Sequence, residues 1–262
     1  MTILTAAIYQ PVADDLSPVQ RLERLDDRLS CIDGAVSDIV LCPELFLSGY
    51  DVGPKILAYA EPADGTSLKR ASEIARKYRT ALAIGYPEQD GDVLYNAVAV
   101  IGKSGERLLD YRKRVLPPGF EGDTFTPGNV PGIFELAGHR VAVLICYDVE
   151  FPEFVREAAN AGANLVLAPT ALKSKWTFVA RKMIPTRAFE NGVFLMYANH
   201  AGREGESEYL GESVIVGPDG AEMAIAGSGE DFITADLDME NVTVARETLP
   251  YLQTVSNRIK CP

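Results

Sequence analysis

Apolar runs of strand length alternate with amphipathic stretches along most of the chain. Seven runs have the length and apolar content of buried strands, at residues 3–9, 38–42, 80–86, 94–101, 140–145, 164–168 and 193–199. Four stretches between them are expected to form helices, at residues 18–31, 67–77, 152–161 and 176–191. Buried strands that alternate with helices of about ten or more residues predict an α/β fold.

Two segments follow a different pattern, in which an apolar run is joined to a second run by a short turn containing glycine. The paired runs are 93–101 with 106–111, around Lys103-Ser104-Gly105, and 213–216 with 222–226, around Pro218-Asp219-Gly220. This spacing predicts β-hairpins, so the sheets should contain both parallel and antiparallel strands. The two halves of the chain repeat the order strand, helix, strand and hairpin, which indicates two similar sheets packed face to face.

The last part of the chain is expected to contain a strand at 232–236, a short helix near 239–247 and an irregular tail at 250–262. Tyr251, Leu252 and Ile259 make this tail apolar enough to pack against another surface. A length of 262 residues suits one large domain with a sizeable core, so we predict a single domain over residues 1–262.

Composition excludes several classes of function. The formal net charge is −12, and no basic stripe with interleaved aromatic residues offsets it, so a nucleic-acid partner is not expected. No apolar run approaches the roughly 20 residues of a membrane span, and the N-terminus lacks the basic segment of a signal peptide. Four cysteines without a CxxC pair predict reduced thiols and a cytoplasmic location.

The two histidines, His139 and His200, are not spaced with the cysteines as metal ligands are, so no metal or organic cofactor is expected. A cysteine protease that pairs Cys146 with His200 and Asn199 is a competing interpretation. A hydrogen-bonded structural role for each histidine explains the sequence more simply.

Cys146 is the sharpest local feature of the chain. It follows the apolar run 141–145 and precedes a turn into the helix expected at 152–161. A cysteine in this setting is held rigidly and can be raised above the sheet, like the serine of a nucleophile elbow. A nearby cation would lower the pKa of the thiol, and the thiolate is the reactive species. Taken alone, however, the segment fits a small buried core residue more simply.

Two further segments place charged residues at the ends of apolar strands. Glu44 comes just after the run 38–42, and the apolar loop that follows it would raise its pKa and suit it as a base. Lys113 ends the segment Tyr111-Arg112-Lys113 after the hairpin. Each also has an ordinary interpretation, as a capping or ion-pairing carboxylate and as part of a solvated basic cluster.

Together these segments resemble the nitrilase superfamily of carbon–nitrogen hydrolases. The shared motifs are a glutamate after a strand, a Tyr-Arg-Lys segment, and Cys-Tyr-Asp followed by Pro-Glu, in the same order and spacing. The similarity continues through residues 126–128, 163–169, 187–193, 198–199, 211–213 and 217–220 and so covers essentially the whole chain. The chain most resembles bacterial aliphatic amidases of the 5-aminopentanamidase type, with Tyr147 where true nitrilases often have tryptophan.

The resemblance implies a four-layer αββα sandwich, with two mixed sheets packed face to face. It also implies a homodimer or higher homo-oligomer, because residues 152–161 and 176–191 match the helices that form the subunit interface of the family. The tail at 250–262 is expected to cross to the partner subunit.

The resemblance also implies a role for each candidate catalytic residue. Cys146 would attack the carbonyl carbon, Glu44 would take the thiol proton and later activate water, and Lys113 would stabilise the oxyanion. Glu121, eight residues after Lys113, would orient the substrate and the lysine. Asp123 is the alternative if the register is shifted.

Other residues are expected to contact the substrate or the oxyanion: Tyr50, Tyr147 through its backbone N–H, Trp176 and Asn199. The implied function is an amidase that hydrolyses a small linear carboxamide through a cysteine thioester. A nitrilase or an N-carbamoyl-amine hydrolase on the same residues is an alternative, and a catalytically silent binding or scaffold protein is another.

A substrate with a distal amine, such as 5-aminopentanamide, is suggested by the acidic cluster Glu204, Glu206 and Glu208, which could meet a cation at the pocket mouth. A solvated acidic loop is the simpler interpretation of this cluster. Lys173 and Lys175 also oppose a cationic substrate.

Overall fold

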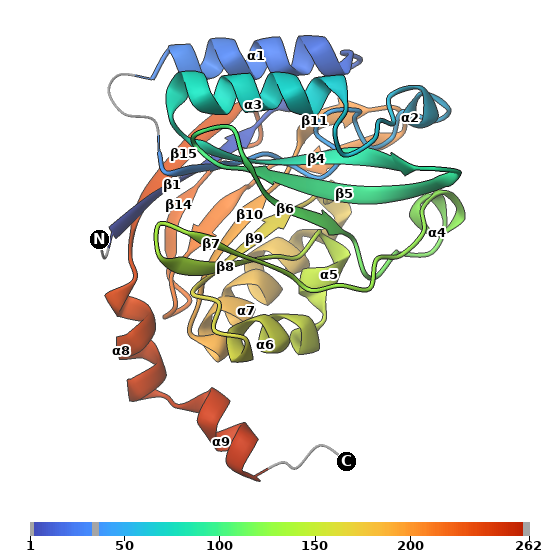
Figure 1. The fold of residues 1–262 in the computed structure, drawn as a ribbon. Coiled ribbons are helices and arrows are strands. Elements are labelled where there is room, and N and C mark those ends of the chain that lie inside the picture. Colours follow the sequence, from blue (N-terminus) through green and yellow to red (C-terminus); the bar gives the residue numbers. More distant parts are fainter. Residues whose placement is uncertain (1–2, 33–36, 259–262) are drawn as a thin grey trace.

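Two six-stranded mixed sheets pack face to face and form the body of the protein (Figure 1). The structure is a computed structural model that describes residues 3–32 and 37–258. The first sheet has the order β15-β1-β3-β4-β5-β6 and the second the order β14-β13-β10-β9-β8-β7. Strands of the first sheet are β1 (Ile3–Gln10), β3 (Ile39–Leu41), β4 (Ala81–Asp90), β5 (Val93–Ile101), β6 (Arg107–Arg112) and β15 (Asp231–Asp238). Strands of the second are β7 (Gly132–Leu136), β8 (His139–Val143), β9 (Leu165–Pro169), β10 (Phe194–Ala198), β13 (Val214–Val216) and β14 (Glu222–Ile225).

The two sheets have the same internal plan. Three parallel neighbours lie at the centre of each, β1-β3-β4 in the first and β8-β9-β10 in the second. An antiparallel pair continues each sheet on one side, β5-β6 and β13-β14, and one antiparallel strand closes the other side, β15 and β7. The repeated order of elements in the sequence therefore corresponds to two similar sheets.

Helices cover the outer face of each sheet, which gives the four layers expected (Figure 1). Helices α1 (Pro18–Ser30) and α3 (Thr66–Tyr78) lie over the first sheet, and α5 (Tyr147–Glu150), α6 (Pro152–Asn160) and α7 (Ile184–Asn191) lie over the second. Alternate residues of a strand face opposite sides of its sheet. Val40 accordingly packs with the residues under α1 and α3, whereas Leu41 packs in the core between the sheets. Burial on both faces explains the continuous apolar runs.

A small third sheet lies beside the sandwich, with the order β12-β11-β2. Its strands are β2 (Val12–Ala13), β11 (Ala201–Glu204) and β12 (Ser207–Leu210). Short helices α2 (Lys55–Ala58) and α4 (Phe120–Thr124) lie in connections of the first half, and α8 (Glu240–Thr248) and α9 (Tyr251–Arg258) end the described chain. No helix among the described residues combines the length and the apolar character that crossing a bilayer requires.

The sequence predicted the central strands and both hairpins correctly but missed the third sheet and β7. The helix expected at 176–191 is present, but it begins with a 3₁₀ turn (Ser174–Trp176) and contains a π-helical turn (Val179–Met183) before α7. Pro185 stands at the start of α7 and has no N–H to donate to the preceding turn, so the regular α-helical hydrogen-bond pattern is interrupted where the π-helical turn meets α7.

The tail was expected to be irregular, but residues 251–258 form α9. Leu252 packs against the core of the second sheet, and the ring of Tyr251 lies 6.0 Å from that of Phe189 on α7. The tail therefore packs against its own chain. Ile259 and Cys261 lie outside the described residues.

Candidate active site

Glu44, Lys113 and Cys146 come from separate parts of the chain and meet between the two sheets. Glu44 follows β3, Lys113 follows β6, and Cys146 follows β8. The ammonium Nζ of Lys113 lies 2.7 Å from Glu44 Oε1 and 2.7 Å from both carboxylate oxygens of Glu121. The side chains of Lys113 and Glu44 are fully buried, and that of Glu121 is 1% exposed. A cation is therefore buried between two carboxylates, and the charges of all three groups act on the thiol of Cys146.

The two carboxylates are held in different ways. The Asn96 amide donates to Glu44 Oε1 at 2.7 Å and to Glu121 Oε2 at 3.0 Å. Glu44 Oε2, by contrast, has no hydrogen-bond partner among the described residues. Burial raises the pKa of Glu44, Lys113 opposes this effect, and the charge of Glu121 adds to it. Glu44 thus has a free, buried oxygen with increased proton affinity, which suits a general base.

Lys113 remains charged in spite of its burial. Burial alone lowers the pKa of the ammonium, but the carboxylates of Glu44 and Glu121 outweigh it, so the net shift is upward. The site therefore holds a permanent positive charge in a water-poor environment, where its electrostatic effect is larger than in water.

Cys146 occupies a strained turn between β8 and α5. Its backbone has φ 46° and ψ −101°, a combination that a non-glycine residue rarely adopts. Its N–H donates to Pro169 O at 2.9 Å. The buried carboxylate of Asp148 accepts from the N–H of Ile145 at 3.0 Å and that of Val115 at 2.8 Å. These bonds hold the turn in place, so the cysteine is lifted out of the strand direction.

The resting thiol of Cys146 is protonated at neutral pH. Burial raises the pKa of the thiol and the charge of Glu44 raises it further, while Lys113 and the Thr170 side chain lower it. The net direction is upward, so nucleophilic attack requires transfer of the thiol proton to a neighbouring base.

A cavity of ≈ 470 Å³ opens at Cys146, large enough for a small organic substrate. Aromatic and aliphatic side chains form most of its wall, with a few charged groups among them. Its lining residues are Tyr50, Pro117, Pro118, Phe120, Glu121, Cys146, Tyr147, Glu150, Ala171, Leu172, Lys173, Lys175, Trp176 and Val179.

Comparison with known proteins identifies the family. The model of the carbon–nitrogen hydrolase family matches residues 5–247. The chain belongs to this family. The resemblance to the nitrilase superfamily is thereby confirmed, and the protein is a carbon–nitrogen hydrolase.

Named relatives and solved structures agree with this assignment. The hydrolase is 40% identical over 253 residues to "Hydrolase in pqqF 5'region" of Pseudomonas protegens, covering 95% of this chain and 88% of that protein. It is 36% identical to omega-amidase NIT2 of Xenopus tropicalis, covering 82% and 81%. A cysteine-to-alanine variant of the amidase of Nesterenkonia AN1, a nitrilase-superfamily protein, superposes with a TM-score of 0.84 at 34% identity over 96% of this chain and 93% of that one. Other structures of that amidase contain butyramide, or the acetamide moiety of fluoroacetamide attached to its active-site cysteine.

Three of the four residues expected to contact the substrate or the oxyanion line the cavity of the hydrolase. Tyr50 and Tyr147 are half-buried there, and Trp176 is 55% exposed at its edge. The Tyr147 N–H is at the first residue of α5 and so has no acceptor within that helix.

Asn199 does not line the cavity, which corrects the expectation of direct contact. Its Oδ1 accepts from Leu172 N at 2.8 Å, and its Nδ2 donates to Leu172 O at 3.2 Å and to Gly211 O at 3.0 Å. The side chain is fully buried and its polar atoms are all engaged. Asn199 therefore supports the cavity wall from behind, through Leu172.

The acidic cluster at 204–208 does not exist as a unit, which corrects the second expectation. Glu204 is buried, whereas Glu206 and Glu208 are exposed, and none of the three lines the cavity. Lys173 and Lys175 do line it. The register of the hairpin explains the separation: Glu204 pairs with the buried Ser207, Glu208 pairs with the exposed Arg203 on the other face, and Glu206 lies in the turn between the strands.

Sequence reasoning missed Asn96 and Thr170. Asn96 is a polar residue inside the apolar strand β5, and such an interruption was the available signal. Thr170 follows β9, the parallel neighbour of β8, and its hydroxyl lies 3.1 Å from that of Tyr197. Residues after adjacent parallel strands converge on one edge, so this position could have been suspected. Among the described residues, no group of three or more acidic, histidine or cysteine side chains is arranged to hold a metal ion.

Proposed function

We propose that the hydrolase is an amidase that cleaves a small linear carboxamide to a carboxylate and ammonia through a thioester on Cys146. The observation that carries this proposal is the unpartnered Oε2 of Glu44 in a buried cluster with Lys113, beside a strained cysteine at a small cavity. A base, a fixed cation and a projected thiol are the groups that acyl transfer requires.

The first half of the reaction forms the thioester. Glu44 takes the thiol proton as the sulfur of Cys146 attacks the carbonyl carbon, and the carbonyl oxygen becomes an oxyanion beside Lys113. When the intermediate collapses, the C–N bond breaks and the nitrogen leaves as ammonia after receiving the proton from Glu44.

Charge compensation favours this order of events. In the resting state Lys113 donates to Glu44 and Glu121. Protonation of Glu44 removes one of the two negative charges around the ammonium at the moment when the oxyanion appears. Lys113 can then turn one N–H toward the oxyanion, with the Tyr147 N–H as a second donor. The interaction between Lys113 and the reacting oxygen is thus stronger in the transition state than in the ground state. Only interactions of this kind accelerate the chemical step.

The second half of the reaction hydrolyses the thioester. Glu44, ionised again after ammonia has left, takes a proton from a water molecule that attacks the acyl carbon. The tetrahedral intermediate then expels the sulfur, which regains the proton from Glu44, and the carboxylic acid leaves. The enzyme returns to its starting state without any other reactant.

The decisive experiment measures ammonia released from a panel of short amides, nitriles and N-carbamoyl amines. We expect turnover of the amides and a mass increase on the Cys146 peptide equal to the acyl group of a slow substrate. Faster turnover of a nitrile or an N-carbamoyl amine would replace the amidase proposal by one of those activities. An acyl group on another residue would contradict the proposed nucleophile.

The distal end of the substrate is proposed to be neutral or anionic. Lys173 and Lys175 border the cavity, and neither has an ion-pair partner within residues 3–32 and 37–258. An unpaired cation attracts an anion and repels an ammonium group. An ammonium group at this end, as in 5-aminopentanamide, is therefore disfavoured.

This choice is tested with three amides of equal length: pentanamide, 5-aminopentanamide and the monoamide of glutaric acid. We expect kcat/KM to be lowest for the amine at low salt, and the difference to shrink in high salt because exposed charges are screened. The double substitution K173M/K175M should remove the discrimination. A preference for the amine would contradict this proposal and leave the amidase assignment intact.

We further propose that the hydrolase is a homodimer that packs through α6, α7 and α9. Apolar side chains remain exposed on α7, on α9 and next to them, including Phe189, Leu249, Tyr251 and Val255, each 40–44% exposed. Burial of such side chains would stabilise an association. Sedimentation analysis at micromolar concentration should give twice the chain mass, and a monomer would contradict the proposal.

A further inference from the structure

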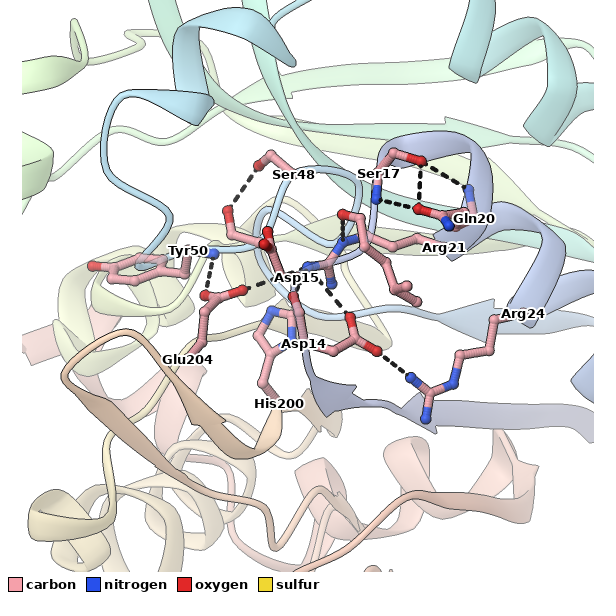
Figure 2. A network of polar contacts seen from close by, with 12 residues as sticks. Asp14, Asp15, Ser17, Gln20, Arg21, Arg24, Ser48, Tyr50, His200 and Glu204 are labelled. Atoms are coloured by element: carbon pink, nitrogen blue, oxygen red, sulfur yellow. Dashed lines mark hydrogen bonds and ion pairs between the residues drawn. The ribbon is translucent and has the colours of Figure 1, made fainter.

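The β11–β12 hairpin contacts the loop that follows Glu44, and one buried carboxylate makes most of this contact (Figure 2). Glu204 Oε2 accepts a hydrogen bond from the N–H of Tyr50 at 2.8 Å and from the N–H of Asp51 at 2.7 Å. The Tyr209 hydroxyl donates to the same oxygen at 3.1 Å. The Glu204 side chain is 7% exposed. The backbone at Tyr50 is therefore fixed by a carboxylate that is carried on the third sheet.

The charge of Glu204 is compensated from a third element. Nη2 of Arg21, on α1, lies 3.5 Å from Glu204 Oε1, and the guanidinium also donates to Asp14 O at 2.5 Å and to Leu16 O at 3.1 Å (Figure 2). Arg21 is 3% exposed, so neither partner can move freely into water. Buried charges of this kind persist where geometry and hydrogen bonds are complete, and they favour one arrangement of the chain.

The loop is shaped to admit this carboxylate. Gly49 has φ +82°, and a Cβ atom at this position would lie 2.3 Å from Glu204 Oε1. At the other end of the loop, His200 of the same connection donates from Nε2 to the backbone oxygen of Glu44 at 2.8 Å. Its ring lies 5.4 Å from that of Tyr209. The loop from Glu44 to Asp51 is thus held at both ends by residues 200–209.

Tyr50 carries this constraint into the active site. Its hydroxyl donates to Glu121 Oε1 at 2.7 Å, and its ring packs edge-on against Phe120 at 5.4 Å. Both oxygens of Glu121 accept from Lys113. Glu204 is therefore connected to Lys113 by a hydrogen bond to the Tyr50 backbone, the Tyr50 side chain, and the hydrogen bonds of Glu121.

We propose that Glu204 is a positioning residue for the hydrolysis described above: it holds the Tyr50 backbone so that the Tyr50 hydroxyl fixes Glu121, and through it the Lys113 cation that meets the oxyanion. This inference rests on the proposed function for its effect on turnover. The alternative is a purely structural role, in which Glu204 only satisfies buried amides and Arg21. A positioning role predicts a slower rate at each correctly folded active site. A purely structural role predicts fewer folded sites, each with an unchanged rate.

The first test is Glu204→Gln, which keeps the shape and one acceptor but turns an NH₂ group either toward the Arg21 guanidinium or toward the three donors that meet Oε2. We expect kcat to fall by about tenfold or more, because a displacement well below 1 Å at a catalytic group is costly, while KM changes less. Rates are expressed per reactive Cys146, counted by active-site titration. Glu208→Gln, the same exchange at an exposed position of the same hairpin, serves as the matched control and should behave as wild type.

The second test is a double-mutant cycle with Tyr50→Phe, which removes only the hydroxyl that reaches Glu121. If Glu204 acts through Tyr50, the double variant E204Q/Y50F should be about as slow as the slower single variant. Independent effects that multiply would overturn the proposal. So would a lower number of titratable sites with an unchanged kcat per site, because that result is the signature of a structural role.

A third measurement separates this inference from the amidase proposal. The rate of Cys146 alkylation by iodoacetamide, followed by peptide mass spectrometry, reports the geometry around the thiol without requiring turnover. Cys31 is exposed and serves as an internal reference in the same sample. Slower labelling of Cys146 in Glu204→Gln, with Cys31 unchanged, supports the positioning role even if wild type hydrolyses no amide. Unchanged labelling together with unchanged kcat would overturn it.

Discussion

The two sheets share one plan, yet they contribute different chemistry to the site. In the first sheet, β3 is followed by Pro43 and then Glu44; in the second, the equivalent strand β9 ends at Pro169 and is followed by Thr170. Both side chains lie close enough to Cys146 to alter the pKa of its thiol, and they act in opposite directions: the Glu44 charge raises it, and the Thr170 hydroxyl lowers it. One backbone position thus holds a carboxylate in one half and a neutral donor in the other.

The strands next to β3 and β9 also differ between the two sheets. In the first sheet β1 continues regularly to Gln10, whereas the equivalent strand β8 leads into the strained turn at Cys146. The three charged groups that meet at Lys113, namely Lys113 itself, Glu44 and Glu121, follow strands β3 and β6 of the first half. The shared architecture thus places strand ends at equivalent positions in the two halves. The residue at each strand end decides which chemical role that half of the chain has.

The largest effect is expected from Cys146→Ala. The variant has no nucleophile, so hydrolysis should fall by more than about 10⁴-fold. It leaves only a small void, and the free energy of unfolding should change little. Ammonia release and the thermal unfolding midpoint measure the two quantities. Substantial remaining activity would show that hydrolysis does not depend on the cysteine in the strained turn after β8.

Glu44→Gln should produce the next largest effect. The amide cannot accept the thiol proton, and loss of a general base typically costs about 10²- to 10⁴-fold in rate. Since burial raises the pKa of Glu44, wild-type kcat/KM should rise with pH through a pKa above the usual carboxylate value of about 4.3. The variant should lack this acidic limb. An unaltered pH profile of kcat/KM would exclude Glu44 as the base.

Thr170→Val tests the counterpart of Glu44 in the second half and should have a smaller effect. Valine has nearly the same shape but no hydroxyl, so the polar group that lowers the pKa of the thiol is lost. We expect kcat/KM to decrease by about tenfold, which corresponds to about one pKa unit at the thiol. A loss as large as that of Glu44→Gln would break the contrast between the two strand ends.

The smallest effect concerns stability rather than rate. Because the pKa of Glu44 is raised in the folded protein, folding binds its proton more tightly than the unfolded chain does. The stability contributed by this group is present below about pH 4.3 and is lost as the pH rises through the folded pKa. Glu44→Gln should therefore gain stability relative to wild type with increasing pH, by about 1–3 kcal/mol. Urea unfolding at several pH values measures it, and a constant difference would contradict it.

Much of this architecture could be predicted from the sequence because local patterns specify local structure. Both faces are buried in the central strands, so these strands appear in the sequence as continuous runs of apolar residues. They are β1, β3, β4, β8, β9 and β10. Glu44, Lys113 and Cys146 stood out because each follows such a run, and the ends of strands in packed sheets converge on shared edges. Their order and spacing then matched a known family.

The sequence did not reveal the burial or the hydrogen-bond partners of several site residues, namely Asn199, Glu204 and Thr170. A sequence records that Glu204 is acidic but not whether its carboxylate meets solvent or buried amides, since that depends on the hairpin that carries it. Asn199 stands at the end of a central strand, as a substrate-binding residue would, yet its amide is satisfied by Leu172 and Gly211. Burial and hydrogen-bond partners are properties of the packed chain.

The sequence by itself therefore determined the fold class, the central strands and the hairpins of the two sheets, and the residue types available for chemistry, because periodicity and strand ends are local properties. Only the tertiary structure decided that Glu44 keeps one oxygen free and that Lys113 lies between two carboxylates. It also decided that Glu204 faces the Tyr50 backbone instead of the cavity mouth. The physical reason is that solvent exclusion and hydrogen-bond geometry arise between segments far apart in the chain, and they set the proton affinity and orientation of each group.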